Sequence, residues 1–190
     1  MSTQSEGALV PALDMIQIRW HSRGGQGGMT ASQLLGQAAF EDGKQATAFS
    51  FYGAERRGAP LTSYNRIADQ PIKLYSRVTS PDMVVILDES LVDIQDVTDG
   101  LDEDGIVVIN TTEPDLVDHD GRIVAVDATS IALDYDLSVD GTPIVNTPIL
   151  GAVARTDAAD IDTVARVIDE EFGEANMKAA REAYENATEV

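Results

Sequence analysis

The sequence predicts a single α/β domain in which a mainly parallel sheet is flanked by helices. A strand, a glycine-rich turn and a helix follow one another between residues 15 and 40. Three short apolar runs in the middle of the chain are typical of strands buried on both faces. Two helical stripes of apolar residues lie in the C-terminal part. Strands that alternate with helices indicate a sheet with parallel strands.

The first unit begins with Ile16, Ile18 and Trp20, which alternate with polar residues as in a strand. Four of the five residues 24–28 are glycine, and apolar residues then recur at helical spacing (Ala31, Leu34, Leu35 and Ala38). Glycine permits close backbone approach and positive φ, and a helix N-terminus offers unpaired N–H groups to an anion. The segment therefore suits a phosphate.

Two interpretations of this turn stay open. It lacks the third glycine of GxGxxG, because Thr30 stands there, and no Gly-Lys-Ser/Thr of a Walker A loop follows. The glycines either cradle a phosphate or only relieve crowding in a tight strand-to-helix turn.

The next elements are a second strand at 45–49 and an irregular loop at 50–60 that is rich in glycine and charge. Residues 61–67 and 71–74 alternate as strands do and are expected to pair as a hairpin. The apolar runs at 82–88, 105–109 and 122–126 predict three more strands.

Asp127 is a suitable start for a short helix after the last of these strands. Residues 142–148 are expected to be irregular around two prolines, with a helix opening at Ile149. The stripes at 161–172 and 177–187 predict two more helices, separated at Gly173. These elements predict one Rossmann-like domain over 15–190 and a disordered leader over 1–14.

Composition narrows the functional class. No apolar run approaches the length of a membrane span, and the first fourteen residues lack the features of a signal peptide. We therefore expect a cytoplasmic protein without a membrane partner. The absence of cysteine excludes disulfides and cysteine-ligated iron–sulfur clusters in this chain.

The net charge of −20 is unevenly placed. Residues 15–80 carry eight basic side chains against four acidic ones, whereas residues 81–190 carry five against twenty-seven. The basic region is where an anionic ligand is expected, unless its arginines pair with acidic neighbours. The acidic half would repel a nucleic-acid backbone, so no nucleic-acid partner is expected.

Aspartate outnumbers glutamate by 21 to 12, and lysine occurs only three times. Such a surface stays hydrated in concentrated salt and repels itself in dilute buffer. We therefore hypothesise a halophilic protein from a salt-rich cytoplasm.

The residues offer no complete catalytic group and no metal site. His21 adjoins the glycine turn, but the sequence shows no partner for it, and a polar supporting role is expected. The serines lie in no nucleophile-elbow sequence.

Four blocks in order carry a resemblance: SRGGQG at 22–27, YGAERRGAP at 52–60, NRIADQPI at 65–72 and PIVNTPILGA at 143–152. From about Met15 to Ala187, the chain resembles the gamma subunit of 2-oxoacid:ferredoxin oxidoreductases. The ERRGAP form is most similar to the pyruvate-type branch, the pyruvate synthases.

The resemblance implies a subunit of an enzyme that converts a 2-oxoacid and coenzyme A to acyl-CoA and CO₂, or runs the reverse, with ferredoxin as electron carrier. It implies alpha, beta and delta partner subunits that hold thiamine diphosphate, Mg and iron–sulfur clusters. For this chain it implies a part in coenzyme A binding and in subunit packing, and no activity alone. The loop at 50–60 is expected to pack against the thiamine-binding subunit.

The candidate coenzyme A residues are Arg23, Gly24, Gly25, Gln26, Gly27, Gly28, Thr30, Arg56, Arg57 and Asn146. The alternatives are a structural subunit that touches no ligand, and a gamma subunit specific for 2-oxoglutarate or branched-chain 2-oxoacids. An independent nucleotide-binding enzyme is disfavoured, because no acidic residue follows the second strand to bind a ribose.

Overall fold

The computed structural model describes residues 15–50, 58–156 and 158–190. The predicted leader at 1–14 lies outside these residues. The helices and strands, two short 3₁₀ helices included, are β1 (Met15–Arg23), α1 (Gly28–Glu41), β2 (Gln45–Ser50), β3 (Pro60–Ala68), β4 (Met83–Ile86), η1 (Glu89–Leu91), β5 (Ile106–Asn110), η2 (Pro114–Leu116), β6 (Arg122–Val126), α2 (Ala128–Asp134), β7 (Ser138–Val139), β8 (Thr142–Pro143), α3 (Asn146–Ala154), α4 (Ile161–Phe172), α5 (Glu174–Asn186) and β9 (Thr188–Glu189).

The main sheet has the order β2-β3-β1-β4-β5-β6-β9 in the described chain. Strands β1, β4, β5 and β6 are parallel neighbours, and they form the centre of the sheet. The strands on either side, β3 and β9, pair antiparallel with this centre, and β2 pairs antiparallel with β3. The predicted α/β fold is confirmed, with a mixed rather than uniformly parallel sheet.

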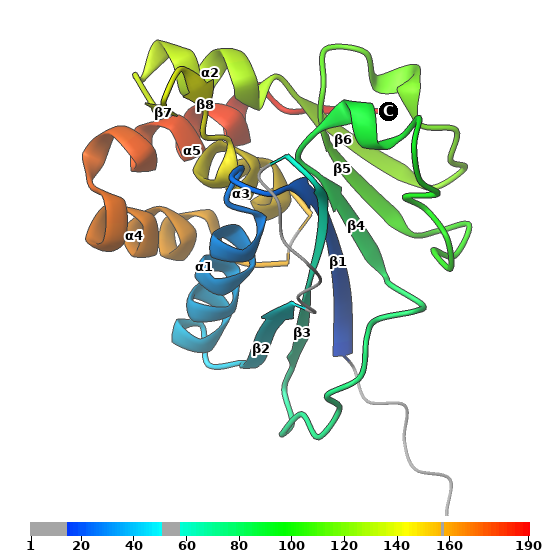
Figure 1. The fold of residues 1–190 in the computed structure, drawn as a ribbon. Coiled ribbons are helices and arrows are strands. Elements are labelled where there is room, and N and C mark those ends of the chain that lie inside the picture. The colour runs from blue at the N-terminus through cyan, green and yellow to red at the C-terminus, as the bar shows by residue number, and fades with distance from the viewer. Residues whose placement is uncertain (1–14, 51–57, 157) are drawn as a thin grey trace, which may run out of the picture.

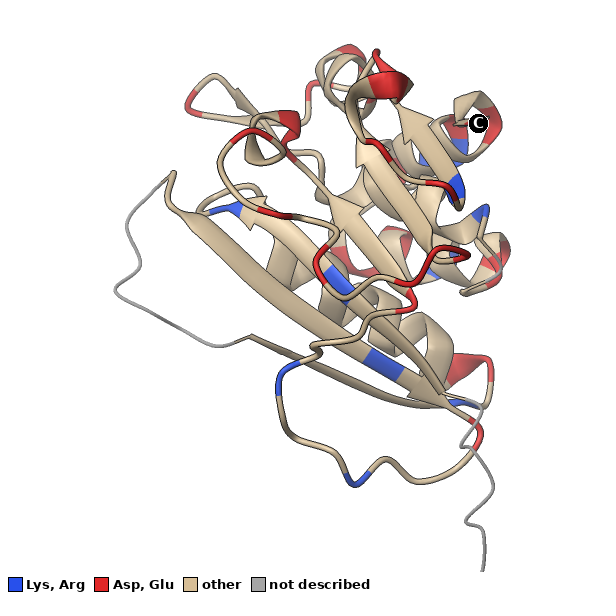
Figure 2. Cartoon of the chain, turned by 90° about the vertical axis from the view of Figure 1, so that its right-hand side faces the viewer, with Lys and Arg blue, Asp and Glu red and all other residues tan. Residues whose placement is uncertain are grey.

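Helices α1, α3, α4 and α5 lie on one side of the sheet (Figure 1). Helices α1 and α3 pack on its strands, and α4 and α5 pack against these two helices. Beneath them, Ile18 and Trp20 of β1 and Val85 of β4 belong to the larger apolar core. A smaller core covers the other face of β4 to β6, where Val84 and Ile109 meet apolar side chains from the connecting loops. In Figure 2, which shows this second face, acidic residues recur along the loops that cover it.

The local signals for helix ends operate as expected. The Asp127 carboxylate accepts from the Ser130 N–H at the start of α2, and Asp160 caps α4 in the same way. Gly173, with φ of 84°, ends α4 and permits the turn into α5. Helix α3 begins at Asn146, three residues before the predicted Ile149, because the first turn of a helix tolerates Pro148.

The predicted hairpin of 61–67 with 71–74 is wrong. Residues 60–68 form β3, but its two edges pair with β1 and β2, and residues 71–74 are not a strand. Pro71 has no N–H to donate to a ladder. Instead, the Arg66 guanidinium donates to the Leu74 and Arg77 carbonyls and holds the following loop against the sheet.

Among the described residues, no helix is both long enough and apolar enough to cross a membrane.

Candidate functional site

The candidate site lies where the carboxyl ends of β1, β4 and β5 meet, the edge at which α/β sheets usually bind ligands. A hollow of about 710 Å³ separates the glycine turn from the β7–β8 hairpin. A second hollow, of about 360 Å³, lies over the ends of β4 and β5 and the start of α2. Gln26, Asp88 and Thr142 line both hollows, which therefore adjoin.

The glycine turn uses the backbone freedom that the sequence suggests. Gly25 and Gly27 have φ of 100° and 81°, a region that disfavours side chains. Gly27 is the N-cap of α1 and supplies no side-chain hydrogen bond to it. The first N–H groups of a helix have no partner within the helix, so this end of α1 can receive an anion.

Packing also demands glycine in this turn. A β-carbon on Gly27 would lie 2.8 Å from Nδ2 of Asn146, and one on Gly28 would lie 2.3 Å from Oγ of Ser22. The fold thus brings Asn146, at the start of α3, against the glycine turn, as the predicted site requires. Thr30 is half-buried in the first turn of α1. Both original interpretations of the turn retain a physical basis.

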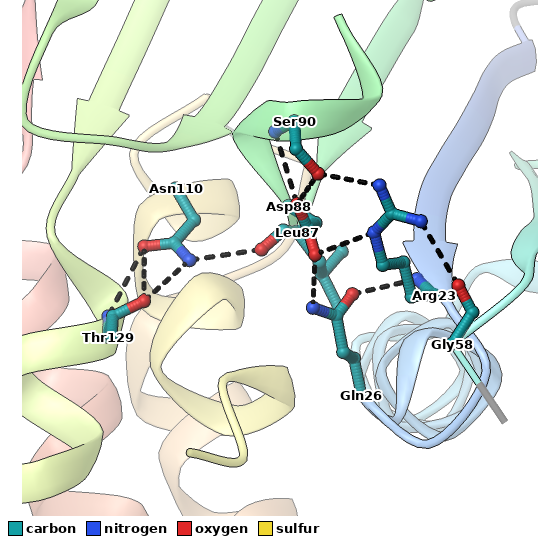
Figure 3. A network of polar contacts seen from close by, with 8 residues as sticks. All are labelled: Arg23, Gln26, Gly58, Leu87, Asp88, Ser90, Asn110 and Thr129. Carbon is teal, nitrogen blue, oxygen red and sulfur yellow. Dashed lines mark hydrogen bonds and ion pairs between the residues drawn. The ribbon is translucent and has the colours of Figure 1, made fainter. Parts of the chain in front are cut away.

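Arg23 is engaged inside the chain (Figure 3). Its Nε lies 3.1 Å from Oδ2 of Asp88, Nη1 donates to the Gly58 carbonyl, and Nη2 donates to Oγ of Ser90. Gln26 donates to the same Asp88 oxygen over 2.8 Å, and its Oε1 accepts from the Arg23 N–H. Arg23, Gln26 and Asp88 therefore join the glycine turn to the end of β4.

Asp88 holds its negative charge in this network. Burial alone would raise its pKa, but hydrogen bonds from Ser90 and Gln26 and the charge of Arg23 outweigh burial. The net result is a pKa below the ordinary value of 3.8. A phosphate near Arg23 would face this carboxylate, so the backbone N–H groups of α1 are the better anion donors.

A second polar pair closes the other hollow. The Asn110 amide donates to the Leu87 carbonyl and to Oγ1 of Thr129, and its Oδ1 accepts from the Thr129 N–H. It ties the end of β4 to the start of α2 (Figure 3). Asp88 and Asn110 are not among the predicted site residues, although a polar residue at the end of an apolar strand is a signal for such a position.

The model of the pyruvate ferredoxin/flavodoxin oxidoreductase family matches residues 17–186. The chain belongs to this family. The expected resemblance is thereby confirmed, and the match extends over the glycine turn, the strands from β1 to β6 and the helices α1 to α5.

Relatives of similar length agree with the family assignment. The pyruvate synthase subunit PorC of Methanothermobacter marburgensis is 50% identical over 176 residues, covering 90% of this chain and 97% of the relative. The pyruvate/ketoisovalerate oxidoreductases common subunit gamma of Thermococcus kodakarensis is 48% identical over 181 residues, covering 90% and 96%. The crystal structure of the pyruvate oxidoreductase subunit PORC of Thermotoga maritima has a TM-score of 0.79 and 38% identity, with coverage of 93% and 98%.

In this oxidoreductase family member, much of the basic region is used internally. Arg19 is buried and donates to His21 and to the Val97 and Asp99 carbonyls. Arg66, 2% exposed, lies over the Phe49 ring. Arg19 and Arg66 therefore stabilise the fold and are not available to an anionic ligand.

His21 supports the fold and is not placed for proton transfer at the cleft. It is 5% exposed, and Nε2 accepts from Arg19 while Nδ1 contacts the Gln95 amide. Burial, and then the charge of Arg19, lowers the pKa of His21 to about 4. The ring is neutral near pH 7, as its expected polar supporting role requires.

Arg56 and Arg57 lie outside the described residues, and so does most of the loop predicted to contact a thiamine-binding subunit. Among the residues that the structure describes, no group of three or more His, Cys, Asp or Glu side chains is arranged to hold a metal ion.

Proposed function

We propose that this chain is the gamma subunit of a multi-subunit pyruvate-type 2-oxoacid:ferredoxin oxidoreductase and contributes to coenzyme A binding. The complex would convert the 2-oxoacid and coenzyme A to acyl-CoA and CO₂, or run the reverse, with electrons passing to ferredoxin. Thiamine diphosphate, Mg and the iron–sulfur clusters would lie on the alpha, beta and delta subunits. The full-length similarity to pyruvate synthase and pyruvate oxidoreductase subunits supports this assignment.

Substrate choice is proposed to lie on the partner subunits. The Thermococcus relative is named as a gamma subunit common to pyruvate and ketoisovalerate oxidoreductases. One gamma subunit can serve two 2-oxoacids if it does not contact the part in which they differ. A branched-chain 2-oxoacid or 2-oxoglutarate therefore stays an alternative substrate for the complex.

The observation that carries the coenzyme A proposal is the start of α1 beside the cleft. Gly27 leaves the helix without a side-chain cap, and Gly25 exposes backbone at positive φ. The phosphates of coenzyme A are anions that such N–H groups bind well. The adjoining hollows give room for the rest of an elongated ligand.

The second candidate is a structural subunit without a ligand. Its specific support is Arg23, which donates to Asp88, Ser90 and Gly58 and so has a full role within the chain. On this alternative, the glycines serve the contacts of Gly27 with Asn146 and of Gly28 with Ser22.

The test compares Gly25→Ala with Gly43→Ala in the assembled enzyme. Both glycines have positive φ, and Gly43 lies just beyond the opposite end of α1 with open space around it. Each variant should therefore carry a similar backbone strain of about 1–3 kcal/mol. We expect only Gly25→Ala to raise the KM for coenzyme A, by about ten-fold, the value of one charged hydrogen bond. The KM for the 2-oxoacid should stay unchanged.

Steady-state kinetics and thermal unfolding of both assembled variants provide the measurements. An equal coenzyme A KM in the two variants, with equal loss of stability, would favour the structural subunit. A raised coenzyme A KM in Gly25→Ala alone would favour the ligand-binding turn.

A further inference from the structure

Residues 70–81, here called the 70–81 loop, depart from the acidic character of the chain. They include no acidic residue and two basic ones, whereas four of the six residues 99–104 are acidic. The loop is nevertheless a surface segment, because residues 73–77 are all exposed. In Figure 2 it projects beyond the lower end of the sheet, with basic residues and no acidic ones. An exposed segment of this composition requires an explanation in a chain of net charge −20.

The centre of the loop is also apolar. Tyr75 is 79% exposed and Leu74, directly before it, is 46% exposed. Single exposed apolar residues are ordinary, but an exposed tyrosine beside an exposed leucine and a lysine resembles the anchor of a protein interface.

The fold holds this loop in a fixed position. Arg66 is fully buried in β3 and donates to the Leu74 carbonyl over 3.3 Å and to the Arg77 carbonyl over 3.4 Å. Val78, 3% exposed, anchors the chain just after Arg77. A backbone held in this way loses little entropy when a partner binds, which favours association.

Lys73 supplies the charge. Of the three lysines, Lys44 pairs with Asp69 at 2.6 Å and Lys178 pairs with Glu174 at 2.8 Å. Lys73 makes no ion pair within the part of the chain that the structure describes. A lysine without a counter-ion in so acidic a chain is the complement of a carboxylate on another molecule.

We propose that the 70–81 loop is a docking site for a different protein subunit that presents an apolar depression with an acidic rim. Tyr75 and Leu74 enter the depression, and Lys73 pairs with a carboxylate on the rim. Burial of the tyrosine provides affinity, and the ion pair orients the two chains. This site is independent of the proposed coenzyme A cleft, which lies at the other end of β1.

The test measures assembly of the full chain with its partner subunits after Tyr75→Ser and Lys73→Glu. Phe40→Ser is the matched aromatic control, since Phe40 is 67% exposed on α1, and Lys178→Glu is the matched charge control. We expect Tyr75→Ser to weaken assembly about thirty-fold, as for a central interface residue. Lys73→Glu should weaken it about ten-fold and Lys73→Arg not at all. The controls should stay within about two-fold of the parent.

Size-exclusion chromatography of the mixed subunits reports assembly, and circular dichroism of each isolated variant reports folding. Parent-like assembly of Tyr75→Ser and Lys73→Glu would overturn the proposal, as would equal losses in the controls. Analytical sedimentation of the isolated chain tests whether a second copy of this chain, rather than a different subunit, binds the 70–81 loop. A dimer that Lys73→Glu dissociates would identify self-association and also overturn the proposal.

Discussion

The Asp88 carboxylate accepts hydrogen bonds from Arg23, Gln26 and Ser90 at a position only 20% exposed. Arg23 and Gln26 are more than sixty residues away in the sequence, whereas Ser90 is only two residues away. Removal of one donor leaves a partly buried charge with fewer partners, so the loss includes a desolvation cost as well as the contact itself. At the scale of single residues, this carboxylate joins the glycine turn to the end of β4.

We expect Arg23→Ala to lower the free energy of unfolding by about 1–2 kcal/mol at pH 7, since a charged hydrogen bond is lost and Asp88 stays ionised. In Arg23→Ala/Asp88→Asn the loss should be smaller, because no partly buried carboxylate is left without its cation. Urea unfolding of the four proteins of this cycle measures the coupling. Additive single-variant losses would show that the pair does not act as a unit.

The same pair predicts a pH dependence. The pKa of Asp88 is lower in the folded chain than its ordinary value, so the carboxylate stabilises the fold above pH 3.8. This stability is lost as the pH falls through the folded-state pKa. The difference in unfolding free energy between the parent and Asp88→Asn should shrink as the pH falls from about 5 to about 2. A constant difference over that range would contradict the assignment.

Among the secondary-structure elements, helices α3 and α5 make an unusually close contact. Their contact involves Gly151 of α3, where an added β-carbon would lie 1.9 Å from the Ala180 carbonyl oxygen. Ala180 and Ala183 of α5 are fully buried. Small residues permit this close approach, so the helix layer depends on the absence of side-chain volume at one position.

Gly151→Ala should destabilise the fold by about 1–3 kcal/mol, because the two helices must move apart. Gly36→Ala, within α1, is the matched control. Its β-carbon would lie 3.5 Å from the Asn65 amide, an ordinary contact, so it should be neutral or stabilise by up to about 1 kcal/mol. Thermal unfolding distinguishes the two. If Gly151→Ala were as stable as the parent, the α3–α5 contact would have to adjust without a loss of unfolding free energy.

Elements with long periodic or apolar signals could be predicted from the sequence, whereas their pairing could not. The runs that became β4 to β6 and the stripe of α4 follow from hydrophobic pattern alone. The position of β3 between β1 and β2 depends on long-range packing. The β7–β8 hairpin had a local signal in Asp140-Gly141, whose positive φ values of 51° and 77° suit a two-residue turn. The turn alone does not predict a hairpin, because its strands are only two residues long and show no alternation.

The candidate site was predicted only in part, because some of its residues are neighbours in sequence and others meet only through long-range packing. Residues adjacent in sequence, Gly24 to Gly28, revealed the turn. Asn146 was named from the family resemblance and lies against Gly27. The pairing of Arg23 with Asp88 spans 65 residues, and a distant counter-ion cannot be recognised from the local pattern around an arginine.

For the whole molecule, the net charge of −20 predicts a dependence on salt. Carboxylates in the loops repel one another at low ionic strength, and salt screens this repulsion. The free energy of unfolding should rise as KCl increases from about 0.05 M to about 2 M, most steeply below about 0.5 M. Urea unfolding at each KCl concentration measures it. Stability that stays constant from low to molar salt would remove the halophilic hypothesis.

The two apolar cores lie on opposite faces of β4, and this arrangement determines which strands unfold locally and which unfold only with the whole domain. Met83 and Val85 belong to one core and Val84 and Ile86 to the other, so every residue of this strand is buried. Its amide hydrogens should exchange with deuterium only when the whole domain unfolds, whereas those of the edge strand β2 exchange through local fraying. Asp88 lies two residues after β4, so this wall of the cleft adjoins the strand whose amide hydrogens should exchange most slowly. Because Arg23 and Gln26 tie the glycine turn to Asp88, we expect a movement that admits a ligand to come from the β7–β8 hairpin, on the other side of the hollow.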